Sequence, residues 1–476
     1  MIISRQRFIA SVQGASTRWL PFADAASIEL SMPRLLRLAL FQVSVAISVV
    51  LLTGTLNRIM VVELAQPAWL VSLMVAIPLL LAPARALIGY RSDHHRSYLG
   101  WRRVPYLWFG TLMQFGGLAI MPFALIVMTE PHNGPAILGP AAAMLAFVLV
   151  GAGLHTTQTA GLALATDLAT AETRSKVVAL LYISLLVGTI IASLGFAWLL
   201  TDFNYIRLIK VLQGAAMATV VLNLVALWKQ EPRRPDLTHH NQVRPKFRAA
   251  WRQFSERGRT SRLLLGLGVG TMGFSMQDIL LEPYGAEILH MSVSETTSLT
   301  AVWALGMLIA FVVSARLLTD SRDPIRLAAA GCVIGVFAFA TVILAAPISS
   351  VLLFYIGVFG IGLGSGFFAV GTLTAVMALG EESQAGLALG AWGAVSATAT
   401  GVAVFAGGAL RDLFATLSLS GAIDPLLDDA VAAYGAVYHL EILLLFISLI
   451  ALGPVVRKAW QQPEKNKPFG LADFPA

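Results

Sequence analysis

A run of polar side chains lies inside an otherwise apolar stretch of the chain, Gly151 to Lys176. It consists of His155, Thr156, Thr157, Gln158 and Thr159, with Asp167 further along. Polar groups inside hydrocarbon are costly unless they face partners or a cavity, so the run predicts a functional site. The structural alternative is that the threonines bond to carbonyls one turn earlier and the histidine serves a helix contact. We expect Asp167 to brace the next loop through Arg174.

The composition sets the class of protein that must position these groups. The 476-residue chain is 57% apolar and 12% charged, whereas about a quarter of the residues of a soluble domain are charged. Long apolar runs recur along nearly its whole length, which predicts an all-α polytopic membrane protein. The single cysteine, Cys332, excludes a disulfide framework. The formal charge of +7 does not indicate nucleic-acid binding, because the basic residues gather on one side of the membrane.

Twelve transmembrane helices are predicted, in two six-helix halves over residues 38–228 and 263–456. Residues 1–37 are expected to form a cytoplasmic or interfacial leader, with Trp19 and Phe22 at the headgroup level. The leader lacks the compact apolar core and small-residue cleavage site of a signal peptide. The predicted spans cover residues 38–60, 67–88, 104–128, 137–168, 177–200, 205–228, 263–289, 296–318, 324–346, 351–379, 385–410 and 436–456.

The two halves are joined by a hydrophilic segment, residues 229–262. It contains ten Lys or Arg residues against three acidic ones and three prolines, which indicates a basic cytoplasmic linker. Basic residues also concentrate in the loops on the same side as this linker. The positive-inside rule therefore places both termini, including the tail at 457–476, in the cytoplasm.

The halves resemble each other in sequence. A shift of 210 residues lays residues 165–176 over 375–386, and Ser92-Asp93 corresponds to Thr319-Asp320. Equivalent acidic loops in the same order predict a parallel duplication, as in transporters that are built from two repeats.

The loop after the second span resembles the signature loop of the major facilitator superfamily, which locks the cytoplasmic ends of helices together. The residues that carry the resemblance are Gly89, Asp93, Arg96, Arg102 and Arg103, with Gly100 between them and Asp320 in a degenerate second copy. Two histidines follow Asp93 and the spacing to the arginines is stretched, so the match is imperfect. The resemblance implies the major facilitator fold and a gating role for this loop.

Further stretches resemble the PucC/LhaA family, the bacteriochlorophyll-delivery branch of that superfamily in phototrophic bacteria. They are residues 54–64, 92–106, 155–169 and 277–289 and the glycine-rich tenth span, within a resemblance that covers residues 35–455. The glycines of the tenth span allow either close helix packing, which we prefer, or room for a ring.

This resemblance implies a light-harvesting complex assembly factor in the bacterial inner membrane. It would bind and deliver bacteriochlorophyll to antenna polypeptides, with the core (LH1) complex favoured over the peripheral (LH2) complex. The implied partners are the antenna polypeptides, the reaction centre–LH1 complex, bacteriochlorophyll synthase and the insertion machinery. Carotenoid or lipid would be additional ligands.

A second group of polar residues is expected near the periplasmic ends of the first and seventh spans. These are Asn57, Arg58, Gln277, Asp278 and Glu282. Counting about 1.5 Å per residue from the cytoplasmic ends places Arg58 and Glu282 at similar depths, roughly 30 Å in. In the superfamily these two helices adjoin the periplasmic gate, so we predict that Arg58 neutralises Asp278 or Glu282. Alternatively, Arg58 reaches the interface and Glu282 faces water.

His155 is the best candidate for a ligand to the magnesium of bacteriochlorophyll, because it is the one histidine near the middle of a predicted span. Gln158 and Thr159 share its helix face at three and four residues on. A neutral imidazole can ligate a metal through one nitrogen while the other is fixed by a hydrogen bond. The alternative is an ordinary interhelical hydrogen bond.

Two other classes of function, a solute transporter and a membrane enzyme, make different demands on the sequence. A conventional major facilitator transporter of a small solute would use the same polar groups near the bilayer midplane. A membrane enzyme that attaches an isoprenoid tail would need several oxygen ligands for a diphosphate-bound magnesium. The cytoplasmic loops offer no suitable aspartate pair, since Asp428-Asp429 lies in a loop predicted on the opposite side of the membrane. We therefore predict that the chain is not an enzyme.

Overall fold

The computed structural model describes most of the transmembrane part of the chain. The described residues are 30–82, 100–129, 137–170, 173–232, 258–319, 323–379, 385–419 and 429–456, with the single residues 27, 85, 88, 91, 92, 95 and 135. Every regular element in these ranges is a helix. Residues 1–26 of the predicted leader, 233–257 of the linker and the tail at 457–476 lie outside them.

The described residues of the N-terminal half form six long helical segments. The first begins at Met32 instead of residue 38, because Ser31 is extended and Pro33 suits the first helical turn. Its turns pass from α-helix to π-helix and back without a break. The elements are α2 (Met32–Val49), η2 (Val50–Thr55), α3 (Leu56–Arg58) and η3 (Ile59–Glu63) in the first segment, then α4 (Ala68–Leu80), α6 (Val104–Thr129), α7 (Leu138–Leu168), α8 (Arg174–Leu199) and α9 (Tyr205–Leu227).

The described residues of the C-terminal half also form six segments, and the first is broken. α11 (Gly258–Ser275) passes into the 3₁₀ turn η6 (Met276–Ile279) and then into α12 (Leu281–Glu287), with a bend of 40°. The others are α13 (Val293–Thr319), α14 (Pro324–Ile348), α15 (Val351–Leu379), α16 (Ala385–Leu419) and α17 (Asp429–Val456).

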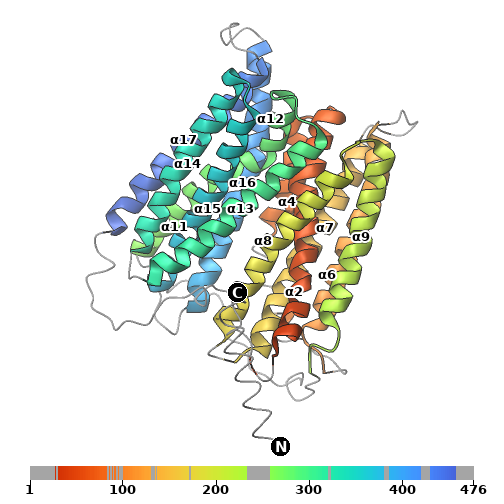
Figure 1. Ribbon diagram of the computed structural model, residues 1–476, viewed down its shortest axis with the longest axis vertical. Helices are drawn as coiled ribbons and strands as arrows, with labels where there is room; N and C mark the ends of the chain where they lie inside the picture. The colour runs from red at the N-terminus through yellow and green to blue at the C-terminus, as the bar shows by residue number, and fades with distance from the viewer. Residues whose placement is uncertain are drawn as a thin grey trace, which may run out of the picture.

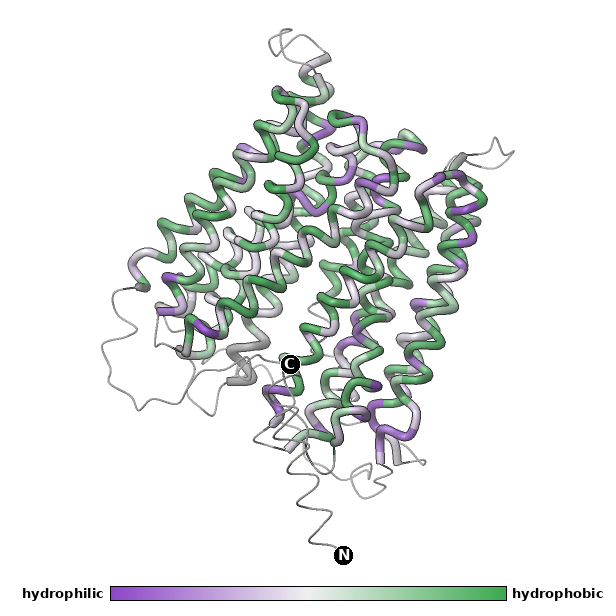
Figure 2. The backbone as a smooth tube through the Cα atoms, in the orientation of Figure 1, coloured by the Kyte–Doolittle hydropathy of each residue, from purple (hydrophilic) through white to green (hydrophobic). Residues whose placement is uncertain are grey.

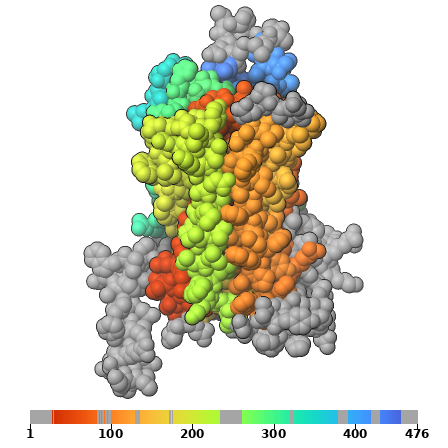
Figure 3. Space-filling model, turned by 90° about the vertical axis from the view of Figure 1, so that its right-hand side faces the viewer, coloured from red at the N-terminus to blue at the C-terminus, as the bar shows by residue number. Residues whose placement is uncertain are grey.

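The predicted spans are therefore present in the predicted order. Within the described residues, ten helices are long and apolar enough to cross a membrane, and the bent pair is an eleventh. The shorter apolar helix α4 occupies the place of the second predicted span, 67–88. The large exposed side chains on α6 and α9, such as Phe123 and Ile206, are apolar. Figure 3 shows these two helices side by side on one face, and such a face suits hydrocarbon.

The two halves meet along two long helix pairs. α4 packs along α16, and α8 packs along α13 (Figure 1). Further contacts join η2 and α3 to η6, α12 and α13 at the end of the bundle where α12 lies. Figure 2 shows hydrophobic backbone over most of the helix lengths and hydrophilic residues concentrated toward both ends, with a few between.

The glycines of α15 serve close helix packing. A methyl group on Gly362 would overlap the carbonyl oxygen of Trp303 in α13, and one on Gly364 would lie 2.8 Å from the carbonyl oxygen of Gly331 in α14. The structure thus agrees with the packing alternative for this helix and not with a slot for a ring.

Candidate functional site

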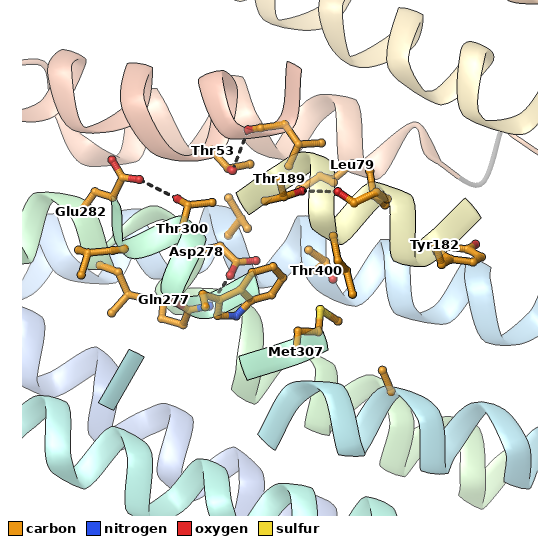
Figure 4. A pocket seen from close by; sticks show the side chains of 18 of the residues that line it. Thr53, Leu79, Tyr182, Thr189, Gln277, Asp278, Glu282, Thr300, Met307 and Thr400 are labelled. Carbon is orange, nitrogen blue, oxygen red and sulfur yellow. Dashed lines mark hydrogen bonds between the residues drawn. The ribbon is translucent and has the colours of Figure 1, made fainter. Parts of the chain in front are cut away.

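A cavity of about 400 Å³ lies between the two halves. Its wall is mainly apolar and includes the indoles of Trp303 and Trp392, and its polar groups come mostly from the broken helix and from threonines (Figure 4). Among the described residues that line it there is no Lys, Arg or His. The polar lining residues are Thr53, Tyr182, Thr189, Gln277, Asp278, Glu282, Thr300 and Thr400.

The break in the seventh segment brings Gln277 and Asp278 to the cavity. The Gln277 side chain donates to the carbonyl of Phe274 at 3.0 Å and to the Asp278 carboxylate. Its own Oε1 is buried and has no hydrogen-bond partner in the described part of the chain. Two oxygen-bearing side chains therefore face an apolar space with unused hydrogen-bonding capacity.

Glu441 of α17 supports the break from behind. Its Oε1 accepts a hydrogen bond from the backbone N–H of Gln277 at 2.7 Å, while its Oε2 is buried without a partner among the described residues. A 3₁₀ turn leaves N–H groups without their α-helical acceptors, and this side chain replaces the missing carbonyl at Gln277. The sequence already held a signal for Glu441, since a carboxylate in an apolar span is a functional or structural candidate.

Glu282 lies at a contact between the two halves, beside Gly54 of η2. Its Oε1 accepts from the hydroxyl of Thr300 at 2.9 Å, while its Oε2 is buried without a partner among the described residues. A methyl group on Gly54 of η2 would overlap this carboxylate, so the glycine is what allows the contact.

Arg58 makes no direct ion pair with Asp278 or Glu282 in the described part of the chain, although it lies close enough to Glu282 for electrostatic interaction. Its guanidinium bonds instead to Glu63 at 2.5 Å, and a second arm reaches the carbonyl of Met291 at 3.5 Å. The π-helical turn explains the difference, because it brings residues five apart onto one face. Asn57 nevertheless joins the two halves, since its amide donates to the carbonyl of Ile279 in the break at 2.8 Å.

His155, Gln158 and Thr159 lie apart from the cavity wall. His155 is 8% exposed, lies against the carbonyl of Pro78, and has no partner at Nδ1 among the described residues. Gln158 accepts a hydrogen bond from Arg85 and lies 3.4 Å from the side chain of Gln42. The Thr159 hydroxyl bonds to the carbonyl of His155 one turn earlier, as the structural alternative for the polar run expects.

The gating loop is described only in part. Gly89, Asp93, Arg96 and Asp320 lie outside the described residues. Arg102 and Arg103 both pair with Asp167, at 3.3 and 3.0 Å. Asp167 thus braces the loop between the second and third spans. The predicted contact between Asp167 and Arg174 is not formed, because Arg174 bonds to the carbonyl of Thr166 instead.

Several cavity residues were not singled out by the sequence. Trp303, Trp392 and Tyr182 are aromatic residues in apolar helices, where such residues are common on every face. No group of three or more His, Cys, Asp or Glu side chains in the described ranges could hold a metal ion by itself. An apolar wall with a few oxygen-bearing groups is typical of a site for an organic ligand.

Two packed six-helix halves around a central cavity define the major facilitator fold. A solved structure of the peptide transporter POT in complex with sulfate matches with a TM-score of 0.66 over 91% of this chain and 96% of that chain, at 16% identity. A bacterial homolog of the human lysosomal transporter Spinster matches with a TM-score of 0.62 over 89% and 95%, at 14% identity. The prediction of this fold is confirmed.

The sequence profile of the family described as PUCC protein matches residues 55–460, and the chain belongs to that family. A Rhodobacter capsulatus protein described as an uncharacterized protein in the puhA-bchM intergenic region is 50% identical over 481 residues, covering 100% of both chains. The protein PucC of Cereibacter sphaeroides is 48% identical over 445 residues, covering 93% of this chain and 96% of that one. The predicted family is therefore confirmed.

Proposed function

We propose that this protein is a light-harvesting complex assembly factor that binds bacteriochlorophyll in the central cavity and delivers it to antenna polypeptides. LH1 polypeptides are the proposed clients and LH2 polypeptides the alternative. Membership of the PucC family supports a role in photosynthesis. The fold supports a membrane protein that carries a ligand in a cavity between its two halves and performs no covalent chemistry.

The observation that carries the proposal is the chemistry of the cavity. Its volume of about 400 Å³ lies near the lower end of the roughly 300–1,000 Å³ range of organic-ligand sites, so it would take part of the macrocycle while the isoprenoid tail stays outside. Trp303 and Trp392 offer flat faces against which a macrocycle can stack. A neutral pigment ester also suits a wall in which the described residues include no basic side chain.

Bacteriochlorophyll as cargo brings a magnesium ion that takes an axial ligand. Magnesium prefers oxygen ligands, and Gln277 and Asp278 present oxygen atoms at the cavity. His155, the ligand predicted from the sequence, lies at the contact between α4 and α7 instead. We therefore place the polar contacts of the pigment at the break in the seventh segment.

The test is the absorption spectrum of the full-length protein purified from phototrophic membranes. Near-infrared bacteriochlorophyll bands in stoichiometric amount are expected. Trp303→Leu should weaken pigment binding about two- to tenfold, from the ~0.5–1.5 kcal/mol of an aromatic contact. Trp198→Leu, which removes an exposed tryptophan far from the cavity, is the matched control.

A colourless protein that binds a soluble compound in the same cavity would instead favour a conventional transporter of a small solute. That alternative is supported by the likeness to solute transporters and by the two carboxyl groups on the broken helix. A pigment content that is equal in Trp303→Leu, Trp198→Leu and the parent protein would remove the cavity as the pigment site.

A further inference from the structure

A positively charged side chain, Arg85, is half-buried in the N-terminal half and has no acidic partner among the described residues. Its Nη2 donates to the side-chain oxygen of Gln158, and its Nε is buried with no hydrogen bond in the described part of the chain. In the described part of the chain, the ion pairs of the N-terminal half involve Arg58, Arg102, Arg103 and Arg207, and none involves Arg85. An enclosed guanidinium that lacks a counter-charge is strongly unfavourable, so this position calls for a negative group from elsewhere.

The neighbours of Arg85 are polar and come from three further helices. We name Gln42 of α2, Arg85, His155 and Gln158 of α7, and Tyr182 of α8 the Arg85 cluster. His155 and Tyr182 both lie close enough to Arg85 for direct electrostatic interaction. His155 is more than nine-tenths buried, and its Nδ1 has no partner among the described residues. The cluster therefore holds unused hydrogen-bonding atoms around an uncompensated charge.

This cluster adjoins the central cavity. Tyr182 lines the cavity, as does Leu79, which precedes Arg85 along the second segment. In Figure 4, Tyr182 lies on the side of the cavity opposite to Glu282. A ligand in the cavity thus has carboxyl groups toward one end and a guanidinium just beyond the other.

We propose that the Arg85 cluster is a subsite for an oxyanion, a carboxylate or a phosphate, carried by a molecule that enters the cavity. The guanidinium fork matches both groups in geometry, and charge-assisted bonds of this kind are among the stronger hydrogen bonds in proteins. This proposal goes beyond pigment delivery, because a neutral pigment ester does not require a buried positive charge. The oxyanion has two sources, the free propionate of a tetrapyrrole that is not yet esterified and the phosphate of a phospholipid.

Two matched ligand pairs separate these sources in titrations of the full-length protein in nanodiscs made with an uncharged lipid. The first pair is bacteriochlorophyllide a and its methyl ester, which differ in one carboxylate. The second pair is dioctanoyl phosphatidic acid and dioctanoylglycerol, which differ in one phosphate. The parent protein should bind the charged member of one pair more tightly, on the order of tenfold, as a charge-assisted bond requires.

The variants then assign this preference to Arg85. Arg85→Gln should abolish it, and Arg85→Lys, which keeps the charge without the fork, should retain part of it. Arg207→Gln is the control, because Arg207 is an exposed arginine paired with Asp202 outside the cavity. Preference for the carboxylate supports a tetrapyrrole source, and preference for the phosphate supports a lipid source. Equal binding within both pairs, or a preference that survives Arg85→Gln, overturns the proposal.

The thermal stability of the ligand-free protein gives an independent readout. If Arg85 is kept for a ligand, replacing it with the neutral Gln should raise the Tm of the empty protein, since an uncompensated buried charge is removed. A lower Tm would mean a structural role and would count against the subsite. Bacteriochlorophyll itself should bind Arg85→Gln as it binds the parent. If bacteriochlorophyll binds neither the parent protein nor Arg85→Gln, the proposed function is wrong. The pair of phosphatidic acid and dioctanoylglycerol would still test the subsite in that case.

Discussion

At the residue scale, Glu441 stands out because it serves the cavity without lining it. Its side chain is 0% exposed, and its carboxylate accepts from the backbone N–H of Gln277 in the 3₁₀ turn that presents Gln277 and Asp278. The orientation of the polar cavity groups therefore depends on a residue of the last helix. We regard Glu441 as a positioning residue.

Replacing Glu441 with Leu should lower the free energy of unfolding by about 1–3 kcal/mol, since the buried N–H of Gln277 loses its acceptor. Glu441→Gln keeps an acceptor oxygen and should lose less. Both effects are measured by thermal unfolding in detergent, together with pigment content. His439→Gln is the control, because His439 bonds to a carbonyl of its own helix and is not part of the break. Normal stability and pigment content in Glu441→Leu would contradict the positioning role.

At the element scale, the two segments that depart from regular α-helix explain where the sequence-based expectations failed. The predicted depths of Arg58 and Glu282 assume α-helical geometry. Residues 59–63 form a π-helical turn instead, and this turn brings Glu63 into an ion pair with Arg58. Likewise, the predicted span 263–289 runs through Pro283, which stands in the first turn of α12 and cannot bond to the carbonyl of Ile279 at the end of the break. Hydrophobicity predicts that a span exists, but it does not report a local change of helix type.

The contact between α13 and α15 yields a prediction about helix spacing. Gly362→Ala should destabilise the protein by about 1–3 kcal/mol, the usual cost of overpacking, because the added methyl group would overlap the carbonyl oxygen of Trp303. Gly435→Ala in α17 is the matched control. A methyl group there meets nothing within 4 Å, and alanine is favoured in a helix by roughly 0.5–1 kcal/mol. Equal Tm values for the two variants would show that α15 can move away from α13 at little cost.

At the scale of the whole molecule, the order of the spans could be predicted and the lining of the cavity only in part. A bilayer requires long apolar helices, so their number and order follow from hydropathy. Lipid and protein interior are both apolar, however, and hydropathy does not distinguish them. Trp303 lines the cavity and Trp198 is 77% exposed, although both stand in apolar helices. Gln277, Asp278 and Glu282 could be singled out because charged and amide groups are rare in such helices.

The orientation of the molecule in the membrane is the last prediction. The basic loops and linker are expected in the cytoplasm, so the end of the bundle where α12 lies should face the periplasm. A reporter joined after Val456, at the end of α17, should be active only in a form that works in the cytoplasm. One inserted after Ser350, between α14 and α15 at the opposite end, should be active only in a form that works in the periplasm. The exposed side chains near Ser350 give the insertion room, and thermal stability of each fusion protein checks that it is folded. Reversed activity at both sites would invert the molecule and put the Arg85 cluster on the periplasmic side of the cavity. Equal activity at both would contradict the three spans, α15, α16 and α17, that separate Ser350 from Val456.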